Sequence, residues 1–297
     1  MPEERMSDET GAAETSAPAT AAVIGGGTMG AGIAHVLAAA RTDVVVVESE
    51  ATQVDAARNR IVTSLGRAVE RGKLDQDPHE VLARIRFASD VHEIDRATDV
   101  VIEAVPEKPD LKVAVLAAAE QATDSSTVLA SNTSSLSITE LGAALDDPSR
   151  FLGMHFFNPV PASKLVEIVV AEPTAAWARD QAVSWVRALD KTDVVVRDSP
   201  GFATSRLGVT LGLEAIRMLE DGVADAEAID NAMELGYRHP MGPLRLSDLV
   251  GLDVRLAVAE YLQSTLGERF APPQLLRDKV GRGELGRKSG QGFYTWS

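Results

Sequence analysis

The sequence of 297 residues contains no cysteine. The chain therefore has no disulfide, no thiolate metal site and no cysteine nucleophile, and we expect no bound metal. It also lacks any apolar run near the roughly 20 residues that a membrane-spanning helix needs, so we expect no membrane partner. Residues 1–19 are acidic and rich in Ala, Ser and Thr, without the basic start and apolar stretch of a signal peptide. We expect a disordered tail there, and a cytoplasmic location.

Positive charge is scarce as well. The chain has 29 Lys and Arg residues but 44 Asp and Glu residues, which gives a formal net charge of −15 at pH 7. A nucleic-acid-binding protein needs a broad basic surface to offset phosphate repulsion, so that class of partner is set aside. One short stretch is nevertheless basic, and it contains Arg58, Arg60, Arg67, Arg71 and Lys73. Its composition fits either a solvated helix face or a local phosphate site.

Apolar runs alternate with helical patterns along the first two thirds of the chain. Predicted strands cover 21–25, 43–48, 84–89, 99–105 and 127–132, and predicted helices cover 28–40, 51–72 and 110–122. Further strands at RFLGMHFF, KLVEIVV and 193–196, with a helix at 174–190, extend the pattern. This alternation predicts an α/β fold with a doubly wound parallel sheet and right-handed crossovers.

The pattern changes after Asp198, where Pro200 and Gly201 break it. Helical segments then follow at about 202–221, 225–235, 243–265 and 272–281. We therefore expect two domains after the tail. The first, over residues 20–199, holds the sheet, and the second, over residues 200–297, is all-α.

The first predicted strand runs into a glycine-rich turn that fits the pattern G-x-G-x-x-G. Its members are Gly25, Gly26, Gly27, Thr28, Met29 and Gly30. Such glycines permit the tight turn, leave room for a pyrophosphate and let the following helix pack closely, while the helix N-terminus attracts the phosphates. The strand–turn–helix context favours a Rossmann-like dinucleotide site over a glycine turn without a ligand. Because Glu48 can accept a ribose 2′-hydroxyl and would repel a 2′-phosphate, we expect NAD rather than NADP.

A histidine and a carboxylate occur on two successive strand-like runs. His155 ends the first run, and Glu167 lies within the second, beyond a connection that contains Pro159 and Pro161. If the strands are neighbours, Glu167 can orient the imidazole and stabilise it after His155 takes a proton. A lone histidine at a strand end is more often structural, but its place beside Asn158 and after a dinucleotide fold favours catalysis.

The segment SNTSS at 131–135 follows the fifth predicted strand. Ligands of open α/β sheets bind beyond the carboxyl ends of the strands, so Ser134 is placed to hydrogen-bond a substrate oxygen. The alternative is that the segment caps a helix expected at 136–143.

Together these motifs resemble the L-3-hydroxyacyl-CoA dehydrogenases, especially the 3-hydroxybutyryl-CoA dehydrogenase type. The likeness runs from about residue 21 to the C-terminus. It is carried by VIGGGTMGAGIA, VIEAVPE, ASNTSSLSIT, GMHFFNPVPASKLVEIV, PGF, HPMGPLRLSDLVGLD and GRKSGQGFY. The resemblance implies oxidation of the 3-hydroxyl of an acyl-CoA to a ketone, with hydride passing reversibly to NAD. It also implies a homodimer formed through the C-terminal domain.

The resemblance assigns roles to residues at matching positions. His155 is implied as the general base with Glu167 as its carboxylate partner, and Ser134 as a hydrogen-bond donor to the reacting oxygen that also contacts cofactor and substrate. The other cofactor contacts implied are Glu107, Lys112, Asn158 and Lys288. Ser64 and Arg71 fall at coenzyme A-contacting positions, seven residues apart and so on one helix face.

The sequence departs from the family pattern after PGF. The family continues to an asparagine that binds the substrate carbonyl near the catalytic histidine, but here PGFATSR places Ser205 at that position. Loss of one oxyanion donor can lower a rate by about 10²–10³. The change leaves two alternatives: a dehydrogenase of another hydroxy acid or of a carrier-protein thioester, and a non-catalytic NAD-binding protein.

Overall fold

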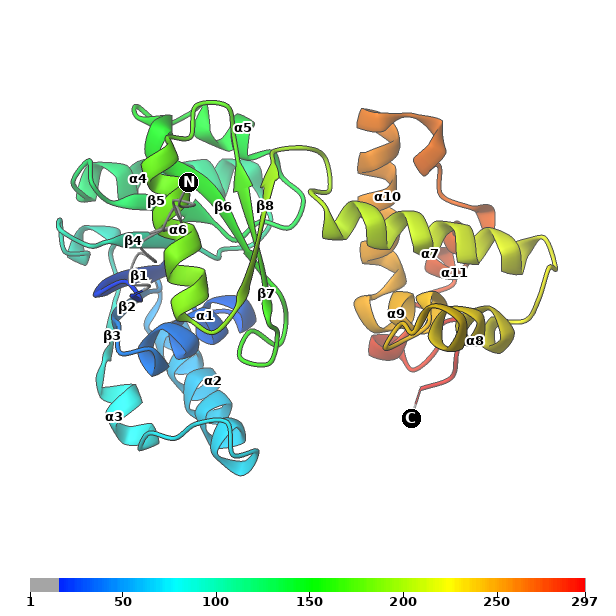
Figure 1. Ribbon diagram of the computed structural model, residues 1–297, viewed down its shortest axis with the longest axis horizontal. Helices are drawn as coiled ribbons and strands as arrows, with labels where there is room; N and C mark the ends of the chain where they lie inside the picture. Colours follow the sequence, from blue (N-terminus) through cyan, green and yellow to red (C-terminus); the bar gives the residue numbers. More distant parts are fainter. Residues whose placement is uncertain (1–15, 297) are drawn as a thin grey trace, which may run out of the picture. The chain divides into compact units, whose positions relative to one another are not determined.

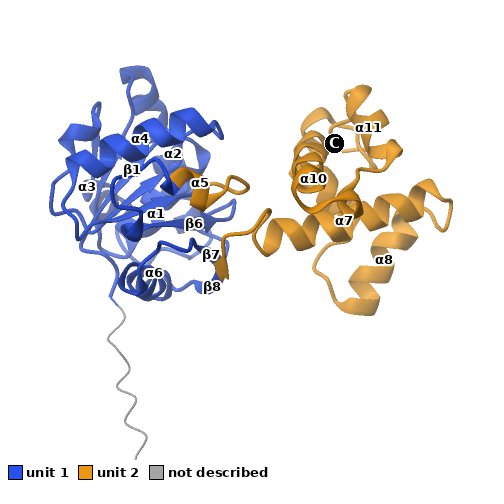
Figure 2. Cartoon of the chain, turned by 90° about the horizontal axis from the view of Figure 1, so that it is seen from above, with its two compact units in different colours: residues 1–132, 142–195 blue, residues 133–141, 196–297 orange. Residues whose placement is uncertain are grey.

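The computed structural model describes residues 16–296, which divide into two compact units (Figure 2). Unit 1 is Met1–Asn132 with Gly142–Val195, and unit 2 is Thr133–Leu141 with Val196–Ser297. Most of the expected disordered tail lies outside the described residues. At its end, the carbonyl of Pro18 accepts a hydrogen bond from Thr42 Oγ1 at 2.7 Å, and that of Ala19 accepts one from the Asp43 N–H at 2.9 Å. Disorder therefore does not extend to these two residues.

The sheet has eight strands in the order β3-β2-β1-β4-β5-β6-β7-β8 (Figure 1). Their bounds are β1 Thr20–Ile24, β2 Asp43–Val47, β3 Ile85–Ala88, β4 Val100–Glu103, β5 Val128–Ser131, β6 Phe151–Phe156, β7 Leu165–Val170 and β8 Thr192–Arg197. Strands β1 to β6 pair in parallel, and the chain changes direction across the sheet between β1 and β4. Ligands of doubly wound sheets bind beyond the strand ends at such a switch point.

Strand β7 runs antiparallel to β6, so the sheet departs from the predicted parallel arrangement at this edge. The reason is the length of the connection. Only residues 157–164 link the two strands, whereas a crossover that returns the chain in parallel needs a dozen or more residues. Because the connection is short, residues that are close in the sequence become direct cross-strand partners on β6 and β7.

Helices pack on the sheet of unit 1 because its β-branched strands are buried on both faces. These helices are α1 Thr28–Ala39, α2 Ala51–Glu70, α3 Pro78–Ala83, α4 Pro109–Ala122 and α6 Ala176–Ala188, and α5 Ile138–Gly142 follows β5. Helix α3 is absent from the sequence expectations. Its start is nonetheless marked locally, since Asp77 accepts a hydrogen bond from the His79 N–H and Pro78 stands at the first helical position.

Unit 2 consists mainly of helices around their own apolar core. They are α7 Thr204–Glu220, α8 Ala226–Tyr237, α9 Pro243–Val250, α10 Leu252–Leu266 and α11 Gln274–Gly281. The single helix expected over 243–265 is wrong, because Gly251 ends α9 with a φ of 107° and α10 starts anew. The expected class, a Rossmann-like α/β part followed by a helical part, is confirmed. No helix within residues 16–296 is long and apolar enough to span a membrane.

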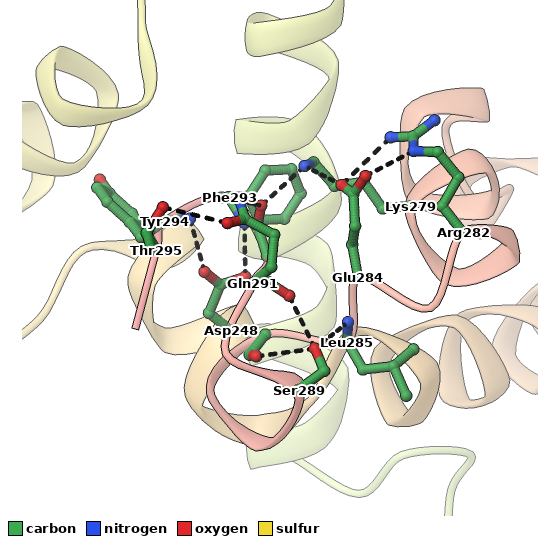
Figure 3. Close-up of polar contacts among 12 residues, drawn as sticks. Asp248, Lys279, Arg282, Glu284, Leu285, Ser289, Gln291, Phe293, Tyr294 and Thr295 are labelled. Atoms are coloured by element: carbon green, nitrogen blue, oxygen red, sulfur yellow. Dashed lines mark hydrogen bonds and ion pairs between the residues drawn. The ribbon is translucent and has the colours of Figure 1, made fainter. Parts of the chain in front are cut away.

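The C-terminal segment is held on α9 by one carboxylate, that of Asp248 (Figure 3). Asp248 is 1% exposed and accepts hydrogen bonds at 2.9 Å from the N–H groups of Phe293 and Tyr294 and from the indole of Trp296. A Cβ on Gly292 would lie 2.1 Å from this carboxylate. Glycine is therefore required where the segment crosses the helix.

Candidate active site

The glycine-rich turn of unit 1 has the geometry of a phosphate cradle. Gly25 adopts a φ of 97°, and a Cβ there would lie 2.9 Å from the Ala104 carbonyl oxygen. A Cβ on Gly30 would lie 1.8 Å from the Gly25 oxygen, so α1 packs directly on the turn. A Cβ on Gly27 would meet no atom within 4 Å. This open space beside the start of α1, at Thr28, fits a dinucleotide pyrophosphate.

The carboxylate that ends β2 lies against the same turn. Glu48 Oε1 accepts a hydrogen bond from the Gly26 N–H at 2.6 Å, and Arg60 donates to the Gly26 carbonyl at 3.2 Å. A carboxylate at this place can receive a ribose hydroxyl of a dinucleotide whose pyrophosphate sits on the turn.

A buried ion pair next to the turn was missed by sequence reasoning. Glu103 ends β4 with no exposed surface, and its carboxylate lies 2.5 Å from Lys112 Nζ and 2.6 Å from Ser131 Oγ. Burial raises the pKa of the Glu103 carboxyl, although the Lys112 ammonium opposes the rise. Lys112 is only 1% exposed, and its Nζ also lies 3.2 Å from Glu107. The pair thereby connects Glu107 to the end of β4.

The histidine and the carboxylate that the sequence places on successive strand-like runs are in contact. His155 on β6 and Glu167 on β7 are direct cross-strand partners, and Nδ1 of the histidine lies 2.8 Å from Oε2 of the glutamate. Their exposed fractions are 6% and 0%. Asn132, which follows β5, accepts a hydrogen bond from the Phe156 N–H at 2.9 Å and fixes the end of β6. The Phe157 ring lies against the imidazole, with 4.3 Å between ring centroids.

A cavity of about 530 Å³ in unit 1 brings several predicted residues together. Its lining comes from α1, from one face of α2 with the residues that follow it, and from the connection after β6. The lining residues are Thr28, Ala31, Gly32, Asn59, Arg60, Thr63, Ser64, Arg67, Ala68, Arg71, Lys73, Asn158, Pro159, Val160, Pro161 and Ala162. Four residues of the basic stretch, Arg60, Arg67, Arg71 and Lys73, therefore line this cavity, whereas Arg58 lies over the Phe87 ring instead.

One polar contact beside this cavity has no sequence signal. His35 on α1 is 3% exposed, and its Nδ1 lies 2.7 Å from Ser64 Oγ. Burial, assisted by repulsion from Lys191, lowers the pKa of His35 to about 4. The ring is therefore neutral at pH 7 and orients the Ser64 hydroxyl.

Three predicted residues lie in unit 2. Ser205 Oγ donates to the Ser134 carbonyl oxygen at 3.4 Å, so these two serines are neighbours. Lys288 Nζ forms an ion pair with Asp253 at the start of α10, at 2.5 Å. All other predicted site residues belong to unit 1.

Both parts of the chain match models of one family. The NAD binding domain of 3-hydroxyacyl-CoA dehydrogenase matches residues 20–199, and the C-terminal domain of 3-hydroxyacyl-CoA dehydrogenase matches residues 201–296. These matches confirm the predicted family and NAD as the cofactor.

Relatives are similar over nearly the whole chain. A probable 3-hydroxybutyryl-CoA dehydrogenase of Deinococcus radiodurans is 42% identical over 275 residues, which cover 92% of this chain and 99% of that one. A 3-hydroxybutyryl-CoA dehydrogenase of Mycobacterium tuberculosis is 44% identical over 281 residues, which cover 92% of this chain and 97% of that one. The crystal structure of (S)-3-hydroxybutyryl-CoA dehydrogenase from Ralstonia eutropha gives a TM-score of 0.90 at 39% identity, and the match covers 95% of this chain and 100% of that one. The chain therefore belongs to the 3-hydroxyacyl-CoA dehydrogenases, a family of NAD-dependent oxidoreductases.

Proposed function

We propose that this chain catalyses the reversible, NAD-dependent oxidation of short L-3-hydroxyacyl-CoA thioesters to 3-ketoacyl-CoA. The observation that carries the proposal is the 2.8 Å contact between His155 Nδ1 and Glu167 Oε2 in a buried setting. The names of the relatives from Deinococcus and Mycobacterium support a four-carbon acyl group, as in 3-hydroxybutyryl-CoA.

The histidine acts as general base and acid. When Nδ1 donates its proton to the Glu167 carboxylate, Nε2 of the neutral ring carries the lone pair that accepts the substrate hydroxyl proton. Glu167 also stabilises the resulting imidazolium. NAD, when bound, supplies the acceptor for the hydride that leaves C3. In the reverse reaction, His155 returns its proton to the oxygen of the forming alcohol.

Most of the proposed cofactor contacts belong to unit 1. The turn from Gly25 to Gly30 takes the pyrophosphate at the start of α1, and Glu48 takes the adenosine ribose and disfavours NADP. Further contacts come from Glu107 and Asn158, with Lys112 and Lys288 at matching family positions. The buried ion pair of Lys112 with Glu103 supports a role in holding Glu107 rather than in meeting solvent.

Coenzyme A binds in the cavity beside α2. Ser64 and Arg71 contact it as in the family, and Arg60, Arg67 and Lys73 add positive charge for its phosphates. His35 keeps the Ser64 hydroxyl oriented through the 2.7 Å contact.

The reacting oxygen is held by serines. We assign the Ser134 hydroxyl to the 3-oxygen, and Ser205 to the substrate carbonyl that an asparagine binds in the family. Their contact at 3.4 Å supports a joint role.

The protein forms a homodimer through unit 2. Exposed apolar side chains on α7 and α8 support this assembly, because Leu207 is 70%, Leu235 80% and Tyr237 76% exposed. Light scattering at micromolar concentration measures the mass, and a monomer would contradict the proposal. A cytoplasmic location stays a prediction.

An NADH-consumption assay tests the proposed reaction. The substrates are 3-ketoacyl-CoAs of increasing chain length and the corresponding free 3-keto acids, with NADPH as the matched cofactor control. We expect turnover of the short thioesters, far weaker turnover of the free acids and preference for NADH. Absence of oxidation with every thioester would overturn the proposal.

A further inference from the structure

Arg255 interrupts the buried stripe of helix α10. The buried residues of this helix are Leu252, Arg255, Ala259 and Leu262, at the spacing of three and four by which a helix faces its core. The side chain of Arg255 is only 9% exposed. An arginine thus occupies a position where the pattern of the helix calls for an apolar residue.

The guanidinium of Arg255 has no acceptor among residues 16–296, and its Nε is fully enclosed. Arg150, the other strongly buried arginine, also has an enclosed Nε without a partner. Its two terminal nitrogens differ from those of Arg255, because they donate to the carbonyls of Asp124 and Glu120 and one lies 3.9 Å from the Glu120 carboxylate. Burial lowers the pKa of Arg255 to about 10, so the group is still a cation at neutral pH. A buried charge without a counter-charge is costly, so Arg255 is a candidate for binding an anionic group from outside its own unit.

The guanidinium lies beside a glycine on the neighbouring helix. A Cβ on Gly208 of α7 would be 3.4 Å from Nη1 and 4.0 Å from Nη2 of Arg255. A larger residue at Gly208 would therefore compete with the guanidinium for space. Gly208 is three residues after Ser205, so both lie on one face of α7 and both are half-buried. Ser205 in turn contacts Ser134, which joins Arg255 to the two serines within one unit.

We propose that Arg255 binds a terminal carboxylate on the acyl group of the substrate, so that the preferred thioesters are short 3-hydroxy dicarboxylic acyl-CoAs. This inference rests on the proposed function, in which Ser134 and Ser205 hold the reacting end of the same acyl group. A carboxylate matches the planar fork of a guanidinium with two parallel hydrogen bonds. The three residues from Ser205 to Gly208 span about 4.5 Å along the helix axis, which suits a chain of few carbon atoms.

The test compares two substrates that differ only in the terminal group, 3-ketoadipyl-CoA and 3-ketohexanoyl-CoA. NADH consumption gives kcat/KM for each. We expect the wild-type protein to favour the carboxylate by roughly 10–10³-fold, because a site built for a polar group discriminates against the analogue that lacks it. In Arg255→Met the ratio should fall close to one, and Arg255→Lys should keep part of it. Arg269→Met removes an exposed arginine of the same unit and should keep the wild-type ratio.

Several outcomes would overturn the inference. One is a wild-type ratio at or below one, which needs no variant and so does not depend on folding of Arg255→Met. Another is an unchanged ratio in a folded Arg255→Met protein, checked by thermal melting. If light scattering shows that Arg255→Met is a monomer while the kcat/KM ratio of the two substrates is unchanged, Arg255 binds a carboxylate of a second copy of the chain and not the substrate. If neither substrate is reduced, the proposed function itself fails, whereas reduction without charge preference removes only this inference.

Discussion

Two buried polar side-chain pairs lie in unit 1, where His155 Nδ1 lies 2.8 Å from Glu167 Oε2 and Lys112 Nζ lies 2.5 Å from Glu103 Oε1. In unit 2 a buried carboxylate meets the backbone instead, as Asp248 does with two N–H groups of the C-terminal segment. Glu167 and Glu103 thus meet a side-chain nitrogen, whereas Asp248 is held mainly by backbone N–H groups.

The difference follows from the secondary structure. The antiparallel strands β6 and β7 place Glu167 directly opposite His155, and helix α4 carries Lys112 back to Glu103 at the end of β4. Helices leave unpaired N–H groups at their ends, and acids satisfy them. Asp230 illustrates this in unit 2, since it accepts the N–H groups of Leu244 and Arg245 in the first turn of α9, at 2.8 and 2.9 Å. Side-chain pairing in unit 1 leaves the imidazole of His155 next to a carboxylate, whereas Asp248 and Asp230 of unit 2 hold backbone segments in place.

The largest effect should come from the reacting pair of unit 1. His155→Ala removes the proton acceptor, so kcat should fall by about 10²–10⁴. Binding of NADH, followed by fluorescence, should persist because the glycine turn is untouched. His79→Ala, which removes an exposed histidine of the same unit, is the control. Near-normal turnover in His155→Ala would refute the catalytic assignment.

The next effect concerns stability rather than rate. Lys112→Met leaves the Glu103 carboxylate enclosed without its counter-charge, which should cost about 3–5 kcal/mol of unfolding free energy. Urea denaturation measures it. The double change Glu103→Gln with Lys112→Met removes both charges and should restore most of the loss. If the single and double variants are equally unstable, the charge pairing is not what stabilises this part of unit 1.

A pH effect tests the neutral imidazole of His35. Burial lowers its pKa from 6.5 to about 4 in the folded chain. Between pH 4 and pH 6.5, His35 is protonated in the unfolded chain but not in the folded one. The contribution of the neutral imidazole to the free energy of unfolding is therefore complete above pH 6.5 and is lost as the pH falls towards 4. The loss amounts to about 3 kcal/mol. His35→Asn keeps a partner for Ser64 without titrating, so the wild-type protein should lose more stability than this variant between pH 7 and pH 4. Equal losses would contradict the shift.

Local patterns were sufficient for much of the fold and for the reacting pair. Unbroken β-branched runs predict buried strands, and the glycine turn predicts its own ligand because its chemistry lies within six consecutive residues. His155 and Glu167 could be paired because both lie on adjoining strand-like runs. The direction of β7 was missed, although the short connection at 157–164 already excluded a parallel return.

Other features depend on the tertiary structure and leave little local trace. His35 and Ser64 are 29 residues apart on different helices. The sequence around Glu103 predicts only the end of an apolar strand and does not indicate the buried ion pair with Lys112. Arg255 does leave a trace, because it falls on the apolar positions of its helix. The consequence of that position needed the structure, which shows Gly208 beside the guanidinium.

The smallest effect should come from the backbone-bound acid of unit 2. Asp248→Asn keeps the shape but removes the charge and one acceptor oxygen, so N–H groups of Phe293, Tyr294 or Trp296 lose a partner. The cost should be about 1–3 kcal/mol, below that of Lys112→Met, because a weakened hydrogen bond is less costly than an unpaired charge. Hydrogen exchange should then accelerate in residues 286–296 and stay unchanged in the strands of unit 1. A loss of protection spread equally over both units would mean that this carboxylate supports more than its own segment, and the contrast between the units would fail.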